Sequence, residues 1–200
     1  MRKILIMTGL VMCFYSTDLF SQSQPLQTKK KNTRFQSYNS LVLLNGSQTV
    51  SGALQSVNGI EMGSFFIGAG VGIDFYRIRS VPVFADIRYT IGKGKRKFFG
   101  YTDIGYHLPW ASEGNLGDSW ASERDFAGGF YADIGLGYLV AIGKNDALVL
   151  SAGYSLKHMS ETAIYNQICT DPWPGIICGP SINSYEYRFN RLSLKVGWRF

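Results

Sequence analysis

One short stretch of the chain combines residue types that could perform hydrolysis, namely His158-Met-Ser160-Glu161. A histidine imidazole can take the proton of a serine hydroxyl and so make the serine oxygen a nucleophile, while a carboxylate orients the histidine. Such a group would cleave an ester or an amide through an acyl-serine intermediate. A His-x-Ser pair also arises readily by chance, so the elements that position it must decide its meaning.

The pair resembles the His-x-Ser motif of the lipid A 3-O-deacylases, which are eight-stranded outer-membrane barrels. The resemblance covers two residues, His158 and Ser160, and implies hydrolysis of an acyl ester of lipid A. In that family an asparagine usually follows the serine, whereas Glu161 stands here. The sequence identifies no counterpart of the family's later carboxylate. We therefore keep the hydrolase as an alternative to a protein without catalytic activity.

Other patterns that carry chemistry are absent from the sequence. There is no GxSxG, no HExxH, no phosphate-binding loop and no metal-ligand spacing, so we expect no metal and no cofactor. His107 is expected to point inward and to form a hydrogen bond rather than to act as a base. The net charge of +6 is not arranged as a basic stripe interleaved with aromatic residues, so no nucleic-acid role is predicted.

The stretch that determines the fold is the last one, residues 191–200. Side chains of a strand alternate between its two faces, which places three cations, Arg191, Lys195 and Arg199, on one face. The other face is wholly apolar: Leu192, Leu194, Val196, Trp198 and Phe200. A transmembrane barrel has this pattern, with apolar residues toward lipid and polar residues inside. The terminal Phe200 resembles the end of the closing strand in bacterial outer-membrane barrels, which implies recognition by the barrel assembly machinery.

Seven earlier segments show strand-like patterns, and the first two are the least clear. Asn58-Gly59 could form a tight turn or lie within the second of them. Each segment is near the length of about 9–11 residues that a tilted strand needs to cross a membrane. The segments are residues 38–45, 50–60, 65–76, 81–91, 98–108, 130–142 and 148–157. The sequence thus predicts an all-β fold, an eight-stranded antiparallel transmembrane β-barrel of up-and-down topology.

The connections between these segments predict the orientation of the barrel. An even strand number places both chain ends in the periplasm, with short turns on that side and long loops outside. The long connections are about 109–126 and 158–185, and we expect them to display a site for an extracellular partner. Cys169 and Cys178 in the second loop could pair in the oxidising exported compartment.

The beginning of the chain has the pattern of an export signal. Arg2 and Lys3 precede an apolar run up to Tyr15 that is too short to span a bilayer as a helix. We therefore predict a signal peptide over residues 1–22, a periplasmic lead-in over 23–34 and the barrel over 35–200. The expected location is the outer membrane, with its lipids as partners and the chain as a monomer.

The inward positions of an eight-stranded barrel must fill a narrow space, since such a barrel is just wide enough for its own side chains. Unpaired buried charges are costly, so the inward charges should pair in a salt-bridge network that leaves no open pore. A small channel is a further alternative. The inward charged residues are Asp74, Asp86, Arg88, Asp103, Asp133, Lys157, Arg191, Lys195 and Arg199.

As a whole, residues 35–200 resemble the porin-like outer-membrane β-barrel proteins common in Bacteroidetes, which are Gram-negative. The resemblance rests on Phe66-Ile-Gly-Ala-Gly-Val-Gly-Ile-Asp-Phe-Tyr76, Val81-Pro-Val-Phe-Ala-Asp-Ile-Arg-Tyr89, Gly153-Tyr154 and the closing strand. These are repeated strand patterns rather than site motifs, so they imply fold and location and no activity. Our interpretation is a non-catalytic membrane scaffold that displays two long loops for binding or adhesion.

Overall fold

The computed structural model describes residues 33–47, 49–92, 94–110, 123–143, 146–165 and 180–200. The predicted signal peptide, residues 1–22, lies outside the described residues, as do residues 23–32 of the predicted lead-in and both Cys169 and Cys178. Within the described part no helix is long and apolar enough to cross a membrane. The strands are β1 (Thr33–Gly46), β2 (Val50–Met62), β3 (Phe65–Asp74), β4 (Ser80–Ile91), β5 (Arg96–Pro109), β6 (Glu123–Ala127), β7 (Gly129–Ala141), β8 (Ala147–Tyr165) and β9 (Ser181–Arg199).

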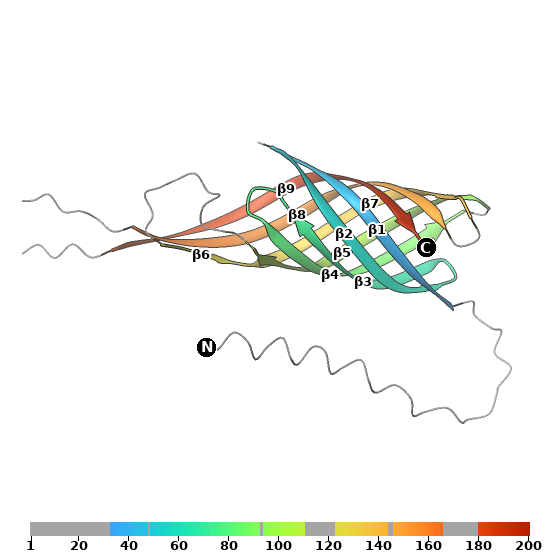
Figure 1. The fold of residues 1–200 in the computed structure, drawn as a ribbon, viewed down its shortest axis with the longest axis horizontal. Coiled ribbons are helices and arrows are strands. Elements are labelled where there is room, and N and C mark those ends of the chain that lie inside the picture. The colour runs from blue at the N-terminus through green and yellow to red at the C-terminus, as the bar shows by residue number, and fades with distance from the viewer. Residues whose placement is uncertain (1–32, 48, 93, 111–122, 144–145, 166–179) are drawn as a thin grey trace, which may run out of the picture. The chain divides into compact units, whose positions relative to one another are not determined.

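The strands form one closed antiparallel sheet (Figure 1). Neighbouring strands pair in sequence, and the pairing of β9 with both β8 and β1 closes the ring. β6 and β7 both pair with β8 and are separated only by a break at Gly128. Together they occupy one strand position in the barrel wall, so the nine strands form eight wall positions. The predicted eight-stranded antiparallel barrel is therefore confirmed.

Alternation along each strand separates an inner and an outer face. From Leu41 to Leu44, β1 is apolar on both faces: Val42 and Leu44 are buried in the interior, whereas Leu41 and Leu43 are exposed outside. Asn58 and Gly59 lie within β2, where Gly59 pairs with Gly68 of β3. The turn between these strands comes later, at Gly63, whose positive φ of 71° suits glycine because it has no Cβ.

Three strands are longer at one end than the sequence pattern suggested. β8 continues through His158 to Tyr165, β9 begins at Ser181 and β6 begins at Glu123, so the expected loop boundaries 109–126 and 158–185 are wrong. Hydrophobic alternation stops before these segments, but antiparallel pairing between β8 and β9 continues to Tyr165 and Ser181. We call this end the loop end and the opposite one, with Thr33 and Phe200, the terminal end. Figure 1 shows β6, β8 and β9 extending past the other strands.

The interior holds two apolar clusters. One contains aromatic side chains from five strands, among them Tyr38, Phe66, Phe84 and Tyr131. The other lies toward the loop end and is built from Val42, Leu44, Ala53, Tyr76, Ile78, Met159 and Phe189. Charged side chains from most of the strands share the interior with these clusters.

Candidate functional site

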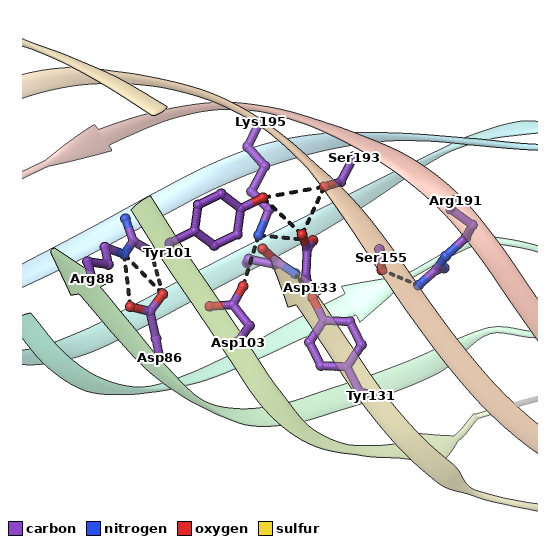
Figure 2. Close-up of polar contacts among 11 residues, drawn as sticks. Asp86, Arg88, Tyr101, Asp103, Tyr131, Asp133, Ser155, Arg191, Ser193 and Lys195 are labelled. Atoms are coloured by element: carbon purple, nitrogen blue, oxygen red, sulfur yellow. Dashed lines mark hydrogen bonds and ion pairs between the residues drawn. The ribbon is translucent and has the colours of Figure 1, made fainter. Parts of the chain in front are cut away.

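The centre of the interior is an ion cluster around Lys195 (Figure 2). Asp86, Asp103 and Asp133 stand directly opposite one another on β4, β5 and β7, which concentrates negative charge in one row. Lys195 of β9 reaches across the lumen, with its Nζ 2.9 Å from Asp103 Oδ2 and 3.2 Å from Asp133 Oδ2. Asp133 also accepts hydrogen bonds from the hydroxyls of Tyr101 and Ser193, at 2.9 and 3.0 Å.

The third carboxylate of this row, Asp86, pairs with Arg88 two positions along the same strand. The Arg88 Nε and Nη2 atoms donate to the carboxylate at 2.9 and 2.7 Å in a two-pronged arrangement. The guanidinium also lies over the Tyr38 ring, 3.9 Å from its centroid. A planar guanidinium can hold a carboxylate with its edge while its face contacts an aromatic ring, which a lysine cannot do.

A second ion cluster lies toward the loop end. Arg191 Nη1 is 2.6 Å from Asp74 Oδ2, and Lys157 Nζ is 3.5 Å from the same oxygen. Arg191 also donates to Ser155 at 2.9 Å. Lys157 donates to the backbone carbonyl of Ile78 at 2.7 Å, so it links the ion cluster to the connection between β3 and β4.

That connection, residues 75–79, closes the loop end of the lumen. Tyr76 and Ile78 are only 2% and 4% exposed and pack with Met159 and Phe189. The Tyr76 N–H donates to Asp74 at 2.8 Å, and Arg77 takes a positive φ of 50° that is uncommon outside glycine. This closure was not predicted. Alternation of Tyr76 and Ile78 with Arg77 and Arg79 was the signal that could have indicated it.

His107 lies inside the barrel as expected and is fully buried. Its Nδ1 is 3.0 Å from Ser80 Oγ, and its ring packs edge-on against Tyr131 with centroids 4.8 Å apart. A general base must reach a proton of a substrate, whereas Nδ1 of this ring is next to Ser80 and the ring itself packs against Tyr131. The geometry favours a structural role for His107.

The two ion clusters balance in charge. Four buried carboxylates, Asp74, Asp86, Asp103 and Asp133, face four buried cations, Arg88, Lys157, Arg191 and Lys195. The ninth predicted inward charge, Arg199, is partly exposed near the terminal end, where its Nη1 is 3.8 Å from Glu61. No cluster of three or more metal-ligating side chains occurs in the part of the chain that the structure describes. Paired charges thus occupy the interior of the described barrel.

His158 and Ser160 lie elsewhere, on the outer face of β8. Pairing of β8 with β9 places Arg188 opposite His158 and Glu186 opposite Ser160. These four residues and Phe130 line a depression of about 500 Å³. The His158 ring contacts Phe130 edge-on, with centroids 6.3 Å apart. Within the described residues His158 and Ser160 share a face and a depression, but no hydrogen bond joins them.

The apolar residues of the closing strand point outward. The five predicted members of the assembly signal, from Leu192 to Phe200, are 42–57% exposed. Phe200 follows β9, and its backbone exchanges two hydrogen bonds with Ser37 of β1, at 2.8 and 3.0 Å. The carboxyl-terminal residue thus takes part in closing the barrel.

No protein-family model and no curated protein sequence matches the chain. Among solved structures, the outer membrane protein AlkL in lipid bilayers is similar over 90% of this chain and 96% of that one, with 11% identity and a TM-score of 0.52. Neisserial surface protein A matches over 84% and 95% (12% identity, TM-score 0.49), and OprG from Pseudomonas aeruginosa over 83% and 95% (8%, 0.48). At such identities the likeness to AlkL shows the fold alone, that of a small outer-membrane barrel.

Proposed function

We propose that this chain is an integral outer-membrane barrel with a closed lumen, which acts as a scaffold for the strands and loops at its loop end. The observation that carries the proposal is the charge-balanced interior together with the inward-folded connection at residues 75–79. With the interior of the described residues filled in this way, we expect neither a continuous pore nor an internal substrate cavity. Its surfaces are then the places where it can interact with other molecules.

Membrane residence is supported by the outer face. Large apolar side chains that are at least 41% exposed occur on all eight wall positions, and soluble monomers rarely expose contiguous patches of this extent. Representative residues are Leu41, Leu54, Ile67, Ile87, Ile104, Ile134, Leu150 and Leu194. Aromatic pairs such as Phe65–Tyr89 and Phe98–Tyr138 lie near the terminal end, as expected of an interfacial girdle.

The display role is supported by the extension formed by β6, β8 and β9. Past the apolar outer surface, the extension is held by pairing of Glu123–Ala127 with Ser160–Ile164. The Glu161 carboxylate also accepts a hydrogen bond from the Tyr187 hydroxyl at 2.7 Å and lies 3.6 Å from Arg124. Such contacts would keep a stiff sheet above the membrane. A binding or adhesion partner would meet this sheet and the connections at its tip.

An epitope tag at the loop end tests this display. We expect a tag inserted after Trp110 to be recognised by antibody on intact cells, because that connection leaves β5 at the loop end. A tag in the turn between β7 and β8, at the terminal end, should be recognised only after the outer membrane is permeabilised. Flow cytometry of the two strains measures both.

The reversed labelling pattern would contradict the proposed orientation. The untagged barrel, purified and shown by circular dichroism to be folded, should also give no stable conductance steps in a planar bilayer, because its lumen is filled. Reproducible steps from the folded chain would overturn the closed scaffold in favour of the small channel.

A second candidate function is supported by the depression on the outer face. We propose, as an alternative, that Ser160 Oγ attacks the carbonyl carbon of an acyl ester of an outer-leaflet lipid while His158 takes the hydroxyl proton. The ester C–O bond then breaks, the lipid alcohol leaves with that proton, and water hydrolyses the acyl-serine to release the fatty acid. Glu186 is opposite Ser160 and diagonal to His158, at a separation that long side chains can bridge. Catalytic hydrogen bonds are often incomplete before substrate binds, so the unlinked pair leaves this function open to test.

Mass spectrometry of lipid A from cells that express the chain decides between the two functions. The hydrolase predicts loss of one acyl chain, abolished by His158→Ala and by Ser160→Ala. Ser184→Ala is a matched control, since Ser184 is an exposed serine of β9 outside the depression. Unchanged lipid A with the folded protein present would eliminate the hydrolase and leave the scaffold.

A further inference from the structure

The outer face carries a polar island inside its apolar belt. It consists of Ser37 and Asn39 on β1 and Asn58 and Ser56 on β2, where Asn39 stands opposite Ser56 and Ser37 opposite Asn58. Outward positions on these strands alternate with inward ones. The two asparagines are exposed and Ser56 is half-buried, whereas Ser37 is only 5% exposed and lies beneath them. We refer to these four residues as the β1–β2 polar patch.

Apolar residues surround the patch on every side. Along β1 it lies between Phe35 and Leu41, which are 69% and 65% exposed, and along β2 between Ile60 and Leu54, at 47% and 46%. On the neighbouring strands, Trp198 stands opposite Asn39, Val71 opposite Ser56 and Ala69 opposite Asn58. The patch is therefore within the depth range of the belt rather than at its rim.

Hydrocarbon cannot satisfy these side chains. Within the patch Asn39 donates one hydrogen bond to Ser37, at 3.5 Å. The side chains of Ser56 and Asn58 make no hydrogen bond to any residue that the structure describes. A polar group in the hydrocarbon region is costly without a partner, and polar side chains between transmembrane segments commonly bond across an interface.

We infer that the β1–β2 polar patch is the contact surface for a second copy of this chain in the membrane. The inference rests on the membrane residence proposed above and replaces the expected monomer by a symmetric dimer. Asparagine amides and serine hydroxyls both donate and accept hydrogen bonds, so the uncharged patch is complementary to itself. A twofold axis along the membrane normal places the polar patches of the two copies at the same depth in the bilayer. A different protein would need polar groups of its own at that depth.

The shape of the outer surface around the β1–β2 polar patch suits close contact with a second copy. A groove of about 780 Å³ has two residues of the patch in its lining, Asn39 and Ser56, together with Leu41 and Leu54. Ala69, next to Asn58, leaves room for the approach of another barrel. The exposed apolar residues around the patch can then pack against the partner while the polar groups bond at the centre.

Energy transfer between labelled copies in liposomes tests the dimer. The label is placed at Gly143→Cys in a background with the native cysteines changed to serine. The unaltered patch should give transfer that rises with protein density, and Asn39→Leu with Asn58→Leu should weaken association by about tenfold. Asn183→Leu with Asn190→Leu is the matched control, since it makes the same exchange on β9 outside the patch, and it should change nothing.

Oxidative cross-linking identifies the face. Ser56→Cys should link two copies, whereas Ile134→Cys, exposed on the far wall position β7, should not. Three results would overturn the inference: no transfer at any density, transfer unaffected by the two leucines, or linking only through position 134. Protein that fails to float with the liposomes would contradict membrane residence, and protein that floats as a monomer would contradict the dimer alone.

Discussion

Replacing Lys195 by methionine is expected to lower the free energy of unfolding by about 3–5 kcal/mol, the usual cost of breaking a buried ion pair by removing one partner. Lys195 contacts two carboxylates at once, Asp103 and Asp133, whose side chains are each 1% exposed. Methionine keeps much of the volume and removes the charge. Asp133 would keep its bonds from Tyr101 and Ser193, but the row of carboxylates would retain only Arg88 as a cation.

Urea unfolding in detergent, followed by tryptophan fluorescence, measures this loss. Arg199→Met is the control on the same strand. Arg199 has one carboxylate nearby, Glu61 at 3.8 Å, and the two side chains are 12% and 19% exposed, so its loss should cost clearly less than that of Lys195. Adding Asp103→Asn and Asp133→Asn to Lys195→Met should restore most of the stability, because the stranded charges are then gone. Equal midpoints for Lys195→Met and the wild type would show that the cluster is not a stabilising element.

Gly105→Ala is expected to prevent normal folding of the barrel. A Cβ at this inward position would meet the backbone carbonyl of Val83 and would lie 2.5 Å from the Cα of Phe84, on the neighbouring strand. Flexible side chains could move away from such a contact, but here β4 itself would have to shift. Overpacking typically costs about 1–3 kcal/mol and more where the backbone cannot yield. Yield of folded protein and the urea midpoint measure the effect.

Gly100→Ala on the same strand provides the control for this prediction. Its added Cβ would have Leu136 Cδ2 as its nearest neighbour, at 3.8 Å, which is an ordinary contact. The intrinsic preference of a strand for alanine over glycine is the same at both positions. Similar stability of the two variants would mean that β4 and β5 can separate at Gly105.

The sequence by itself determined the barrel and the sidedness of most of its strands. Alternation with a period of 2 is a local property, so Phe65 to Phe75 and Leu192 to Phe200 indicated their outer faces without knowledge of their neighbours. The same alternation placed Asp86, Asp103 and Lys195 inside. It was uninformative for residues 41–44 of β1, which are apolar on both faces. It also ended too early for β8 and β9, since antiparallel strands can pair by backbone hydrogen bonds whatever their side chains.

Only the tertiary structure decided which of these residues meet. The contact of Lys195 with Asp103 and Asp133 depends on the stagger and tilt of strands far apart in sequence, and no local pattern encodes that stagger. The same holds for Asn39 beside Ser56, for Glu186 opposite Ser160 and for the closure by Tyr76 and Ile78. Periodicity fixes the face on which a side chain lies, whereas the register between strands fixes its depth and therefore its partners.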